Sequence, residues 1–122
     1  MSTAHDIAYD RFCRGFTNGE WDPFFELVSD EVDFYWPTNP GAGHFTGADG
    51  RAAMEERFRR FGGALRMTDI NVIARSEIGD TVIYEDESSG DMADTPYHAR
   101  HCIFFTLQNG LVVGYREYTG DV

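Results

Sequence analysis

The sequence predicts an α+β domain in which three N-terminal helices pack on one face of a curved, mainly antiparallel sheet. Apolar residues recur at helical spacing in the first half of the chain, whereas the part after Leu65 has strand-like patterns separated by turns. The dipeptide Asn109-Gly110 between two apolar segments indicates a hairpin, because both central positions of its turn need positive φ. At 122 residues the chain is expected to form one domain, residues 1–122, with a single core.

Helices are expected over residues 4–18, 21–28 and 51–61. In each segment apolar residues recur three or four positions apart with charged residues between them, which is typical of a helix with one buried face. Asp22 and Pro23 suit the first turn of the second helix. An aspartate there accepts hydrogen bonds from free backbone N–H groups, and a proline has no N–H group to leave unpaired.

Strands are expected over residues 32–36, 66–76, 80–89, 97–108 and 111–119. The first is β-branched and aromatic and ends at a proline, and the other four follow one another as an antiparallel meander. Between the first strand and the third helix the chain has two prolines and four glycines, a density of helix and strand breakers that predicts a loop.

Composition excludes several classes of function. Twenty-one acidic residues against ten basic ones give a formal net charge of −11, which repels nucleic acids and anionic membrane surfaces. All ten basic residues are arginines, so Schiff-base and P-loop lysine chemistry are excluded. No apolar run approaches the ~20 residues that a bilayer-spanning helix needs, and the first residues lack the pattern of a secretory signal. The expected location is the cytoplasm, with no nucleic-acid or membrane partner.

No metal, cofactor or cysteine nucleophile is expected. Cys13 and Cys102 form no CxxC motif and are interpreted as small buried hydrophobic residues. His98 and His101 are three apart, which places them on opposite faces of a strand and out of reach of a common metal ion. The acidic run at residues 85–94 lacks the spacing of an EF-hand and is interpreted as a solvated hairpin tip.

Acid/base chemistry by side chains of the sheet is the class of function that these observations do not exclude. On the last strand Val113, Tyr115, Glu117 and Thr119 are expected to share one face, and on the preceding strand His101 is the polar member of an apolar face. If these faces lie under the helices, burial disfavours the charged form of both Glu117 and His101. The residues alone leave two alternatives open, a surface ion pair for Glu117 and a hydrogen-bonded core histidine for His101.

The end of the chain resembles a known superfamily. Asn109-Gly110 followed by Arg116-Glu117-Tyr118 is similar to the ending of the SnoaL-like (NTF2-like) superfamily. The segment from Val32 to Pro37 and the pair Gly50-Arg51 resemble its first strand and the opening of its third helix. The resemblance covers nearly the whole chain and implies an NTF2-like cone, in which the helices and the curved sheet enclose a pocket.

The members of this superfamily include polyketide cyclases, ketosteroid isomerases, limonene epoxide hydrolases and proteins without known catalysis. In limonene epoxide hydrolase the acidic residue of this ending is the base that activates water, which implies that role for Glu117. The Arg-x-Asp pair of that enzyme falls at Asp86 and Ser88, so its orienting arginine and general acid are missing. The oxyanion-hole tyrosine and the base of ketosteroid isomerase fall at Phe12 and Trp36. The aromatic segment before Pro37 and the Arg116-Glu117-Tyr118 ending resemble SnoaL-like cyclases more closely, in which an inward acid/base residue moves a proton next to a carbonyl.

The expected function is that of a cofactor-independent acid/base enzyme, of cyclase, isomerase or hydrolase type. Its substrate is expected to be a small apolar oxygenated molecule such as a polyketide or terpenoid. Glu117 is expected to be the general base or acid, with His101 and Asp86 as its polar partners. The expected pocket residues are Tyr35, Trp36, Tyr84 and Phe105 for the apolar wall, and residues 38–47, including His44, for a mobile lip at the mouth.

The alternative is a non-catalytic module of the same fold that binds a small molecule or serves in dimerisation. A homodimer is expected in either case, because the strand at residues 97–108 carries aromatic or β-branched residues on both faces, more than one interior needs. The outer face of the sheet is the expected interface.

Overall fold

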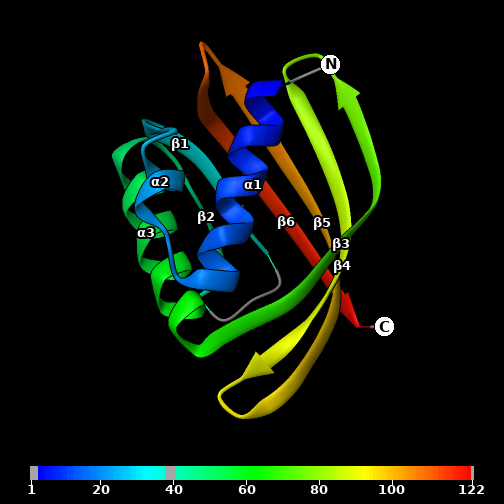
Figure 1. The fold of residues 1–122 in the computed structure, drawn as a ribbon. Coiled ribbons are helices and arrows are strands. Elements are labelled where there is room, and N and C mark those ends of the chain that lie inside the picture. The colour runs from blue at the N-terminus through cyan, green and yellow to red at the C-terminus, as the bar shows by residue number, and fades with distance from the viewer. Residues whose placement is uncertain (1–2, 38–40, 122) are drawn as a thin grey trace.

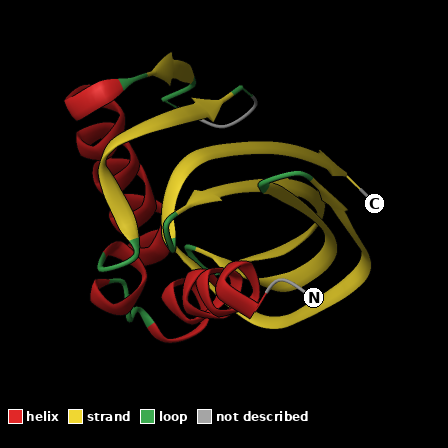
Figure 2. Cartoon of the chain, turned by 90° about the horizontal axis from the view of Figure 1, so that it is seen from above, coloured by secondary structure: helices red, strands yellow, loops and turns green. Residues whose placement is uncertain are grey.

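A strongly curved sheet of six strands, covered on one face by three helices, makes up the part of the chain that the computed structural model describes, residues 3–37 and 41–121. The helices and strands are α1 (Thr3–Asn18), α2 (Asp22–Phe25), β1 (Val28–Trp36), β2 (Gly43–Phe45), α3 (Gly47–Ala64), β3 (Leu65–Ile78), β4 (Thr81–Met92), β5 (Thr95–Gln108) and β6 (Leu111–Asp121). Figure 1 shows the helices together on one side of the sheet, and Figure 2 shows that the sheet curls without closing. This arrangement confirms the predicted α+β class.

The strands follow the order β2-β1-β6-β5-β4-β3 across the sheet. The four strands from β3 to β6 form the expected antiparallel meander, and β1 lies parallel to β6 at the other end. At the β5–β6 turn Asn109 and Gly110 have φ angles of 54° and 79°, as the hairpin signal required. α1 packs against β3 and β5, and α3 packs against β1, so the helices cover the concave face.

The boundaries around the loop region differ from the expectation. α2 ends at Phe25, and β1 already begins at Val28. The glycine-rich segment contains the short strand β2, which pairs with the end of β1, and α3 starts at Gly47. Gly47 has a φ of 63°, a conformation that glycine adopts without strain, and this allows a sharp entry into the helix. Gly47 therefore forms a tight connection between β2 and α3.

The Gly50-Arg51 pair fixes α3 onto β1. A Cβ atom at Gly50 would lie 1.8 Å from the backbone oxygen of Val32, so no larger residue fits this approach. The Arg51 guanidinium donates from Nη1 to the Val28 oxygen at 2.7 Å and from Nε to Glu55 Oε1 at 2.6 Å. The pair is thus explained by the packing of a helix on a strand.

Aromatic side chains fill the space between the helices and the sheet. Trp21 lies between two glycines, because Cβ atoms at Gly15 and Gly62 would each come within 2.4 Å of its indole ring. α1 and α3 can therefore approach each other with only the indole between them. The other large aromatic residues of the core are Phe12, Phe16, Phe24, Phe25, Phe34, Trp36, Phe58, Tyr84, Phe105 and Tyr115.

A β-bulge changes which residues at the start of β6 face inward, so the predicted inner face of this strand is partly wrong. The β5–β6 register shifts between Thr106 and Leu107, so Val113 is the extra residue and Val112 is the one that is buried. After the bulge the alternation is as expected, with Tyr115 and Glu117 on the inner face and both buried.

Only the end of the acidic run forms a hairpin tip. β4 continues to Met92, and the turn lies at Ala93 and Asp94, which both have positive φ. Strand alternation therefore carries Asp86 and Ser88 to the inner face, where they are 2% and 1% exposed. The interpretation of residues 85–94 as solvated was therefore wrong for Asp86 and Ser88, whereas Asp91 and Asp94 are exposed.

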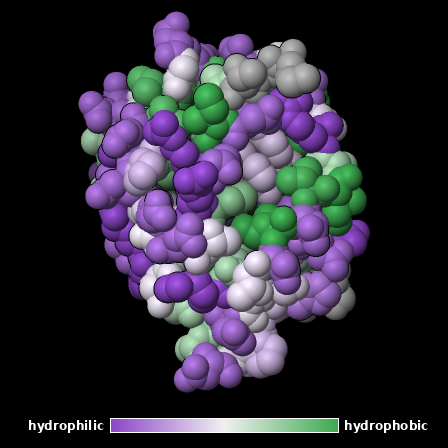
Figure 3. Space-filling model, in the orientation of Figure 1, coloured by the Kyte–Doolittle hydropathy of each residue, from purple (hydrophilic) through white to green (hydrophobic). Residues whose placement is uncertain are grey.

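The surface is mostly hydrophilic, with small separate apolar patches on the face drawn in Figure 3. The exposed large hydrophobic residues include Ile7, Val72, Ile73 and Ile78. Among the described residues, no helix has the length and apolar character that crossing a bilayer requires.

Candidate functional site

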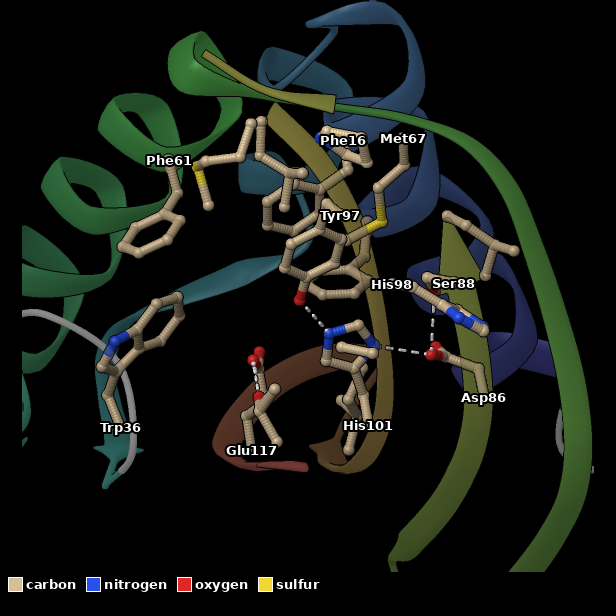
Figure 4. A pocket seen from close by; sticks show the side chains of 18 residues that line it. Phe16, Trp36, Phe61, Met67, Asp86, Ser88, Tyr97, His98, His101 and Glu117 are labelled. Atoms are coloured by element: carbon tan, nitrogen blue, oxygen red, sulfur yellow. Dashed lines mark hydrogen bonds and ion pairs between the residues drawn. The ribbon is translucent and has the colours of Figure 1, made fainter. Parts of the chain in front are cut away.

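A cavity of about 370 Å³ lies between the helices and the inner face of the sheet. Its apolar lining consists of Phe12, Phe16, Trp36, Phe61, Leu65, Met67, Ile70, Met92, Pro96, Ala99 and Ile103. Its polar lining consists of Asp86, Ser88, Tyr97, His98, His101, Glu117 and Thr119. Figure 4 shows these side chains converging from α1, α3 and the strands on one space.

A buried aspartate–histidine pair stands on two neighbouring strands. Asp86 on β4 is paired with His101 on β5, and the distance from Asp86 Oδ1 to His101 Nδ1 is 2.8 Å. The two side chains are 3% and 5% exposed. Because a carboxylate only accepts hydrogen bonds, the proton lies on Nδ1 of His101, and Nε2 is the ring atom left for other chemistry.

His101 is shifted towards its charged form. Burial by itself lowers the imidazole pKa, but the hydrogen bond that His101 donates to Asp86 and the negative charges of Glu117 and Asp86 outweigh it and raise the pKa. The expectation that burial keeps His101 neutral is therefore wrong. It considered the loss of solvent without the two carboxylates that face the ring.

Three hydroxyl groups complete the network of this pair. The Tyr9 hydroxyl on α1 donates to Asp86 Oδ2 at 2.6 Å, and Ser88 donates to Oδ1 at 3.1 Å. On the other side, the Tyr97 hydroxyl lies 2.8 Å from His101 Nε2 and its ring stacks on the imidazole. The Tyr97 hydroxyl donates when the imidazole is neutral and accepts when it is charged, so it can follow the protonation of Nε2.

Glu117 on β6 is held by hydroxyl groups of its own strand. Tyr115 donates to Glu117 Oε1, and Thr119 donates to Oε2 at 3.0 Å. Glu117 is 6% exposed, so the carboxylate has lost most of its water, and burial with Glu117 beside it raises the pKa of Tyr115. Both oxygens of the carboxylate are thereby fixed in position.

Glu117 and His101 face the same cavity from adjacent strands (Figure 4). In the β5–β6 register His101 is opposite Thr119 and Ile103 is opposite Glu117, so the two ionisable groups are diagonal neighbours on the inner face. A carboxylate that can accept a proton and an imidazole that can donate one therefore meet in an apolar, mostly enclosed space. This combination suits general acid/base chemistry.

The structure brings together only part of the expected pocket wall. Trp36 is 1% exposed and lines the cavity. Tyr84 and Phe105 are also buried, but they belong to the core and are not among the lining residues. Tyr84 stacks on Tyr9 at 4.1 Å and donates to Asp6 Oδ1, which directs its hydroxyl away from the cavity.

Tyr35 and His44 were wrongly expected at the pocket. Tyr35 alternates with Trp36 along β1 and therefore points to the outer face of the sheet, where it contacts His44 and Tyr118. His44 is half exposed and lies 2.7 Å from Asp33 Oδ1, on the same outer face. Two adjacent residues of a strand cannot both line one side of it.

The mouth of the pocket also differs from the expectation. Of the predicted lip, residues 38–40 lie outside the described residues, and residues 41–47 form the sheet edge around β2 without lining the cavity. The open rim is formed by Ile70, by Met92 and Pro96 beside the β4–β5 turn, and by His98, whose side chain is 52% exposed. The β4–β5 hairpin therefore takes the place that was assigned to the glycine-rich segment.

Sequence reasoning missed Tyr9, Tyr97 and Phe61. Tyr9 lies one helical turn before Phe12 on the buried face of α1. Tyr97 lies four residues before His101 on β5, on the same face of the strand as Ala99 and His101. Helical and strand periodicity place both residues on inner faces. Neither pattern tells which carboxylate or imidazole their hydroxyl groups reach, because that depends on the packing of α1 against the sheet.

Neither Cys13 nor Cys102 lines the cavity. Burial raises the pKa of the Cys13 thiol to about 12, so it stays protonated near neutral pH. Within residues 3–37 and 41–121, no three His, Cys, Asp or Glu side chains are placed to hold a metal ion.

Comparison with known proteins gives a family match. The SnoaL-like domain family matches residues 9–115 of the chain. No curated protein matches the sequence at a significant level.

Solved structures share the architecture at low sequence identity. An NTF2-like protein from Anabaena variabilis ATCC 29413 has a TM-score of 0.85 at 22% identity, covering 98% of this chain and 89% of that one. A "Putative Isomerase" from Rhodopseudomonas palustris has a TM-score of 0.85 at 16% identity, covering 99% and 92%. An LEH-like epoxide hydrolase from M. tuberculosis has a TM-score of 0.71 at 18% identity, covering 98% and 84%. The likeness confirms the expected cone-shaped fold.

Proposed function

Because the chain belongs to the SnoaL-like domain family, we propose that it is a cofactor-independent acid/base enzyme for a small apolar molecule with an oxygen function. A polyketide or terpenoid fits this description. The observation that carries the proposal is the meeting of Glu117 and the Asp86–His101 pair in one apolar cavity. Each ionisable group is oriented by a second polar side chain, an arrangement typical of catalytic acids and bases.

Glu117 is the proton acceptor in this proposal. Its carboxylate takes a proton from a carbon next to the substrate carbonyl, and negative charge develops on the carbonyl oxygen. His101 Nε2–H or the Tyr97 hydroxyl donates a hydrogen bond to that oxygen, and Asp86 stabilises the charged imidazole. Return of the proton from Glu117 to another carbon completes an isomerisation. In a ring closure the carbanion instead bonds to a second carbonyl carbon, and the proton from Glu117 goes to the alkoxide oxygen that forms. Tyr115 and Thr119 keep the carboxylate in place throughout.

Water activation is the other reaction that the same groups support. The Rhodopseudomonas palustris structure is named an isomerase and the M. tuberculosis structure an epoxide hydrolase, so both reaction classes occur on this fold. For epoxide opening, Glu117 takes a proton from water as the water oxygen bonds to one epoxide carbon. The bond from that carbon to the epoxide oxygen breaks, and His101 protonates this oxygen. Asp86 then supports the acid, a role that differs from the Arg-x-Asp arrangement of limonene epoxide hydrolase.

The cavity limits the substrate to one or two rings. A volume of about 370 Å³ lies near the lower end of the ~300–1,000 Å³ that small-molecule sites occupy. Apolar residues dominate the wall, so the body of the ligand is apolar and the oxygen function meets the polar floor around Glu117 and His101.

Deuterium exchange tests the proposal. One- and two-ring ketones are incubated with the protein in D₂O, and loss of the α-proton signal is followed by NMR, while matching epoxides are assayed for diol formation. We expect at least one ketone that binds to exchange its α-protons faster than in buffer, or one epoxide to open. Probes that bind but neither exchange nor open would instead favour a non-catalytic binding module.

A further inference from the structure

The charged groups that line the cavity are biased towards negative charge. Two carboxylates, Asp86 and Glu117, face one buried imidazole, His101. With His101 charged, these three groups still carry one net negative charge. His98 at the rim is paired with Glu87 at 2.8 Å, so its charge is balanced outside the cavity.

No arginine offsets this bias. Among the described residues that line the cavity there is no arginine, and the whole sequence contains no lysine. Arg66 lies between the lining residues Leu65 and Met67 on β3, but it is exposed on the opposite face. Arg100 precedes His101 and points outward to Glu87 at 2.9 Å. A bound carboxylate or phosphate would therefore meet like charge, because the two imidazoles of the lining, His98 and His101, are already paired with Glu87 and Asp86.

Aromatic rings line the same space. Trp36 and Phe61 lie 5.7 Å apart between ring centroids, Phe12 and Phe16 lie 5.2 Å apart, and all four line the cavity. The negative π-face of an aromatic ring attracts a cation, and the attraction grows when water is excluded. An apolar wall of this kind accepts a neutral group as well, but only a cation gains from both the rings and Glu117.

We propose that the preferred ligand carries a single ammonium group on a small apolar frame, with the positive charge between Glu117 and the aromatic wall. This specificity rests on the proposed function, since it concerns the same cavity. The proposal means that the substrate carries a basic nitrogen in addition to its oxygen function. It also excludes acids, phosphate esters and other anions as substrates.

Three probes of similar shape and different charge test this selectivity. Cyclohexylamine is cationic at pH 7, cyclohexanol is neutral and cyclohexanecarboxylate is anionic, and their dissociation constants are measured by NMR titration of the wild-type protein. We expect the ammonium probe to bind ~10-fold more tightly than the alcohol, and the carboxylate at least ~10-fold more weakly than the alcohol. Equal affinities, or tightest binding of the carboxylate, would overturn the proposal without any variant.

Two charge-matched variants locate the effect. Glu117→Gln and Glu20→Gln each remove one negative charge, but Glu20 is exposed in the loop after α1. Glu117→Gln should remove the preference for cyclohexylamine and keep the affinity for cyclohexanol, whereas Glu20→Gln should leave both unchanged. If both variants lose the preference equally, the net charge of the protein causes it and the proposal fails.

The ketone exchange assay distinguishes a failure of the charge selectivity from a failure of the proposed acid/base function. Exchange of a neutral ketone that depends on Glu117, together with no preference for ammonium, would refute the charge selectivity and leave the acid/base function standing. Ammonium preference with neither ketone exchange nor epoxide opening would support the charge selectivity and contradict the catalytic proposal.

Discussion

Replacement of Asp86 by asparagine tests the buried network most informatively. The carboxylate accepts hydrogen bonds from Tyr9 at 2.6 Å, His101 at 2.8 Å and Ser88 at 3.1 Å, and it is 2% exposed. Asparagine has nearly the same shape, so the substitution leaves no cavity. It removes the negative charge, and its amide group can accept through one oxygen only.

The expected loss of stability follows from these contacts. A hydrogen bond to a charged group contributes ~1.5–3 kcal/mol, against ~0.5–1.5 kcal/mol for a neutral pair. The two short bonds, from Tyr9 and His101, therefore each lose about 1 kcal/mol, and the longer bond from Ser88 loses less. We expect Asp86→Asn to lower the free energy of unfolding by ~2–3 kcal/mol at pH 6.

The effect should depend on pH in a defined direction. The folded-state pKa of His101 is raised above its ordinary value of 6.5, so charged His101 stabilises the fold fully below pH 6.5. That contribution disappears as the pH rises through the raised pKa. Asp86→Asn removes a main support of the charged ring, while burial, which lowers the pKa, remains. The difference between wild type and variant should therefore be larger at pH 6 than at pH 9.

Urea unfolding measured by tryptophan fluorescence at pH 6 and pH 9 checks this prediction, because Trp21 and Trp36 are both buried. Asp91→Asn is the matched control, since Asp91 lies on the same strand and is exposed. The control should change stability by less than ~0.5 kcal/mol at either pH. A loss for Asp86→Asn that is equally large at both pH values would refute the role of Asp86 in holding charge on His101.

Three further outcomes are expected. The chain should form a homodimer through the outer face of the sheet, where Phe104 and Tyr118 are in contact, and sedimentation of only a 13.8 kDa species at micromolar concentration would contradict this. Gly50→Ala should lower the free energy of unfolding by at least ~2 kcal/mol, because the new methyl group meets the Val32 oxygen; denaturation matching wild type would be the opposite result. Cys13, with its pKa of about 12, should react with iodoacetamide at pH 8 more than ~100-fold more slowly than free cysteine, and mass spectrometry showing rapid modification of the folded protein would disprove it.

Periodicity predicted the regular parts of the fold and failed where tertiary contacts decide. The alternation on β5 and the Asn109-Gly110 turn are local properties, and both were predicted correctly. The bulge that buries Val112 depends on the partner strand, so β6 alone could not reveal it. Gly50 was taken as a breaker, but its role is to let α3 approach β1, which no local pattern encodes.

The sequence also predicted part of the candidate site. Strand alternation and the family resemblance selected Glu117 and His101, and the structure places both at the cavity. Asp86 was selected by resemblance alone, since the acidic run around it favoured solvent. The expected role of Tyr35 failed because it neighbours Trp36, and alternation permits only one of them on the inner face. The Tyr97 hydroxyl on His101 depends on side-chain packing that the sequence does not specify.

The most direct test of the account is the rate of α-proton exchange in a ketone that binds, compared between wild type and Glu117→Gln. The substitution preserves volume and removes the proton acceptor, so exchange at saturating ketone should fall by ~10²-fold or more. The dissociation constant of the ketone should stay within ~3-fold, because binding relies on the apolar wall. Glu20→Gln should behave like wild type. Exchange by Glu117→Gln at or near the wild-type rate would contradict the assignment of Glu117 as the base.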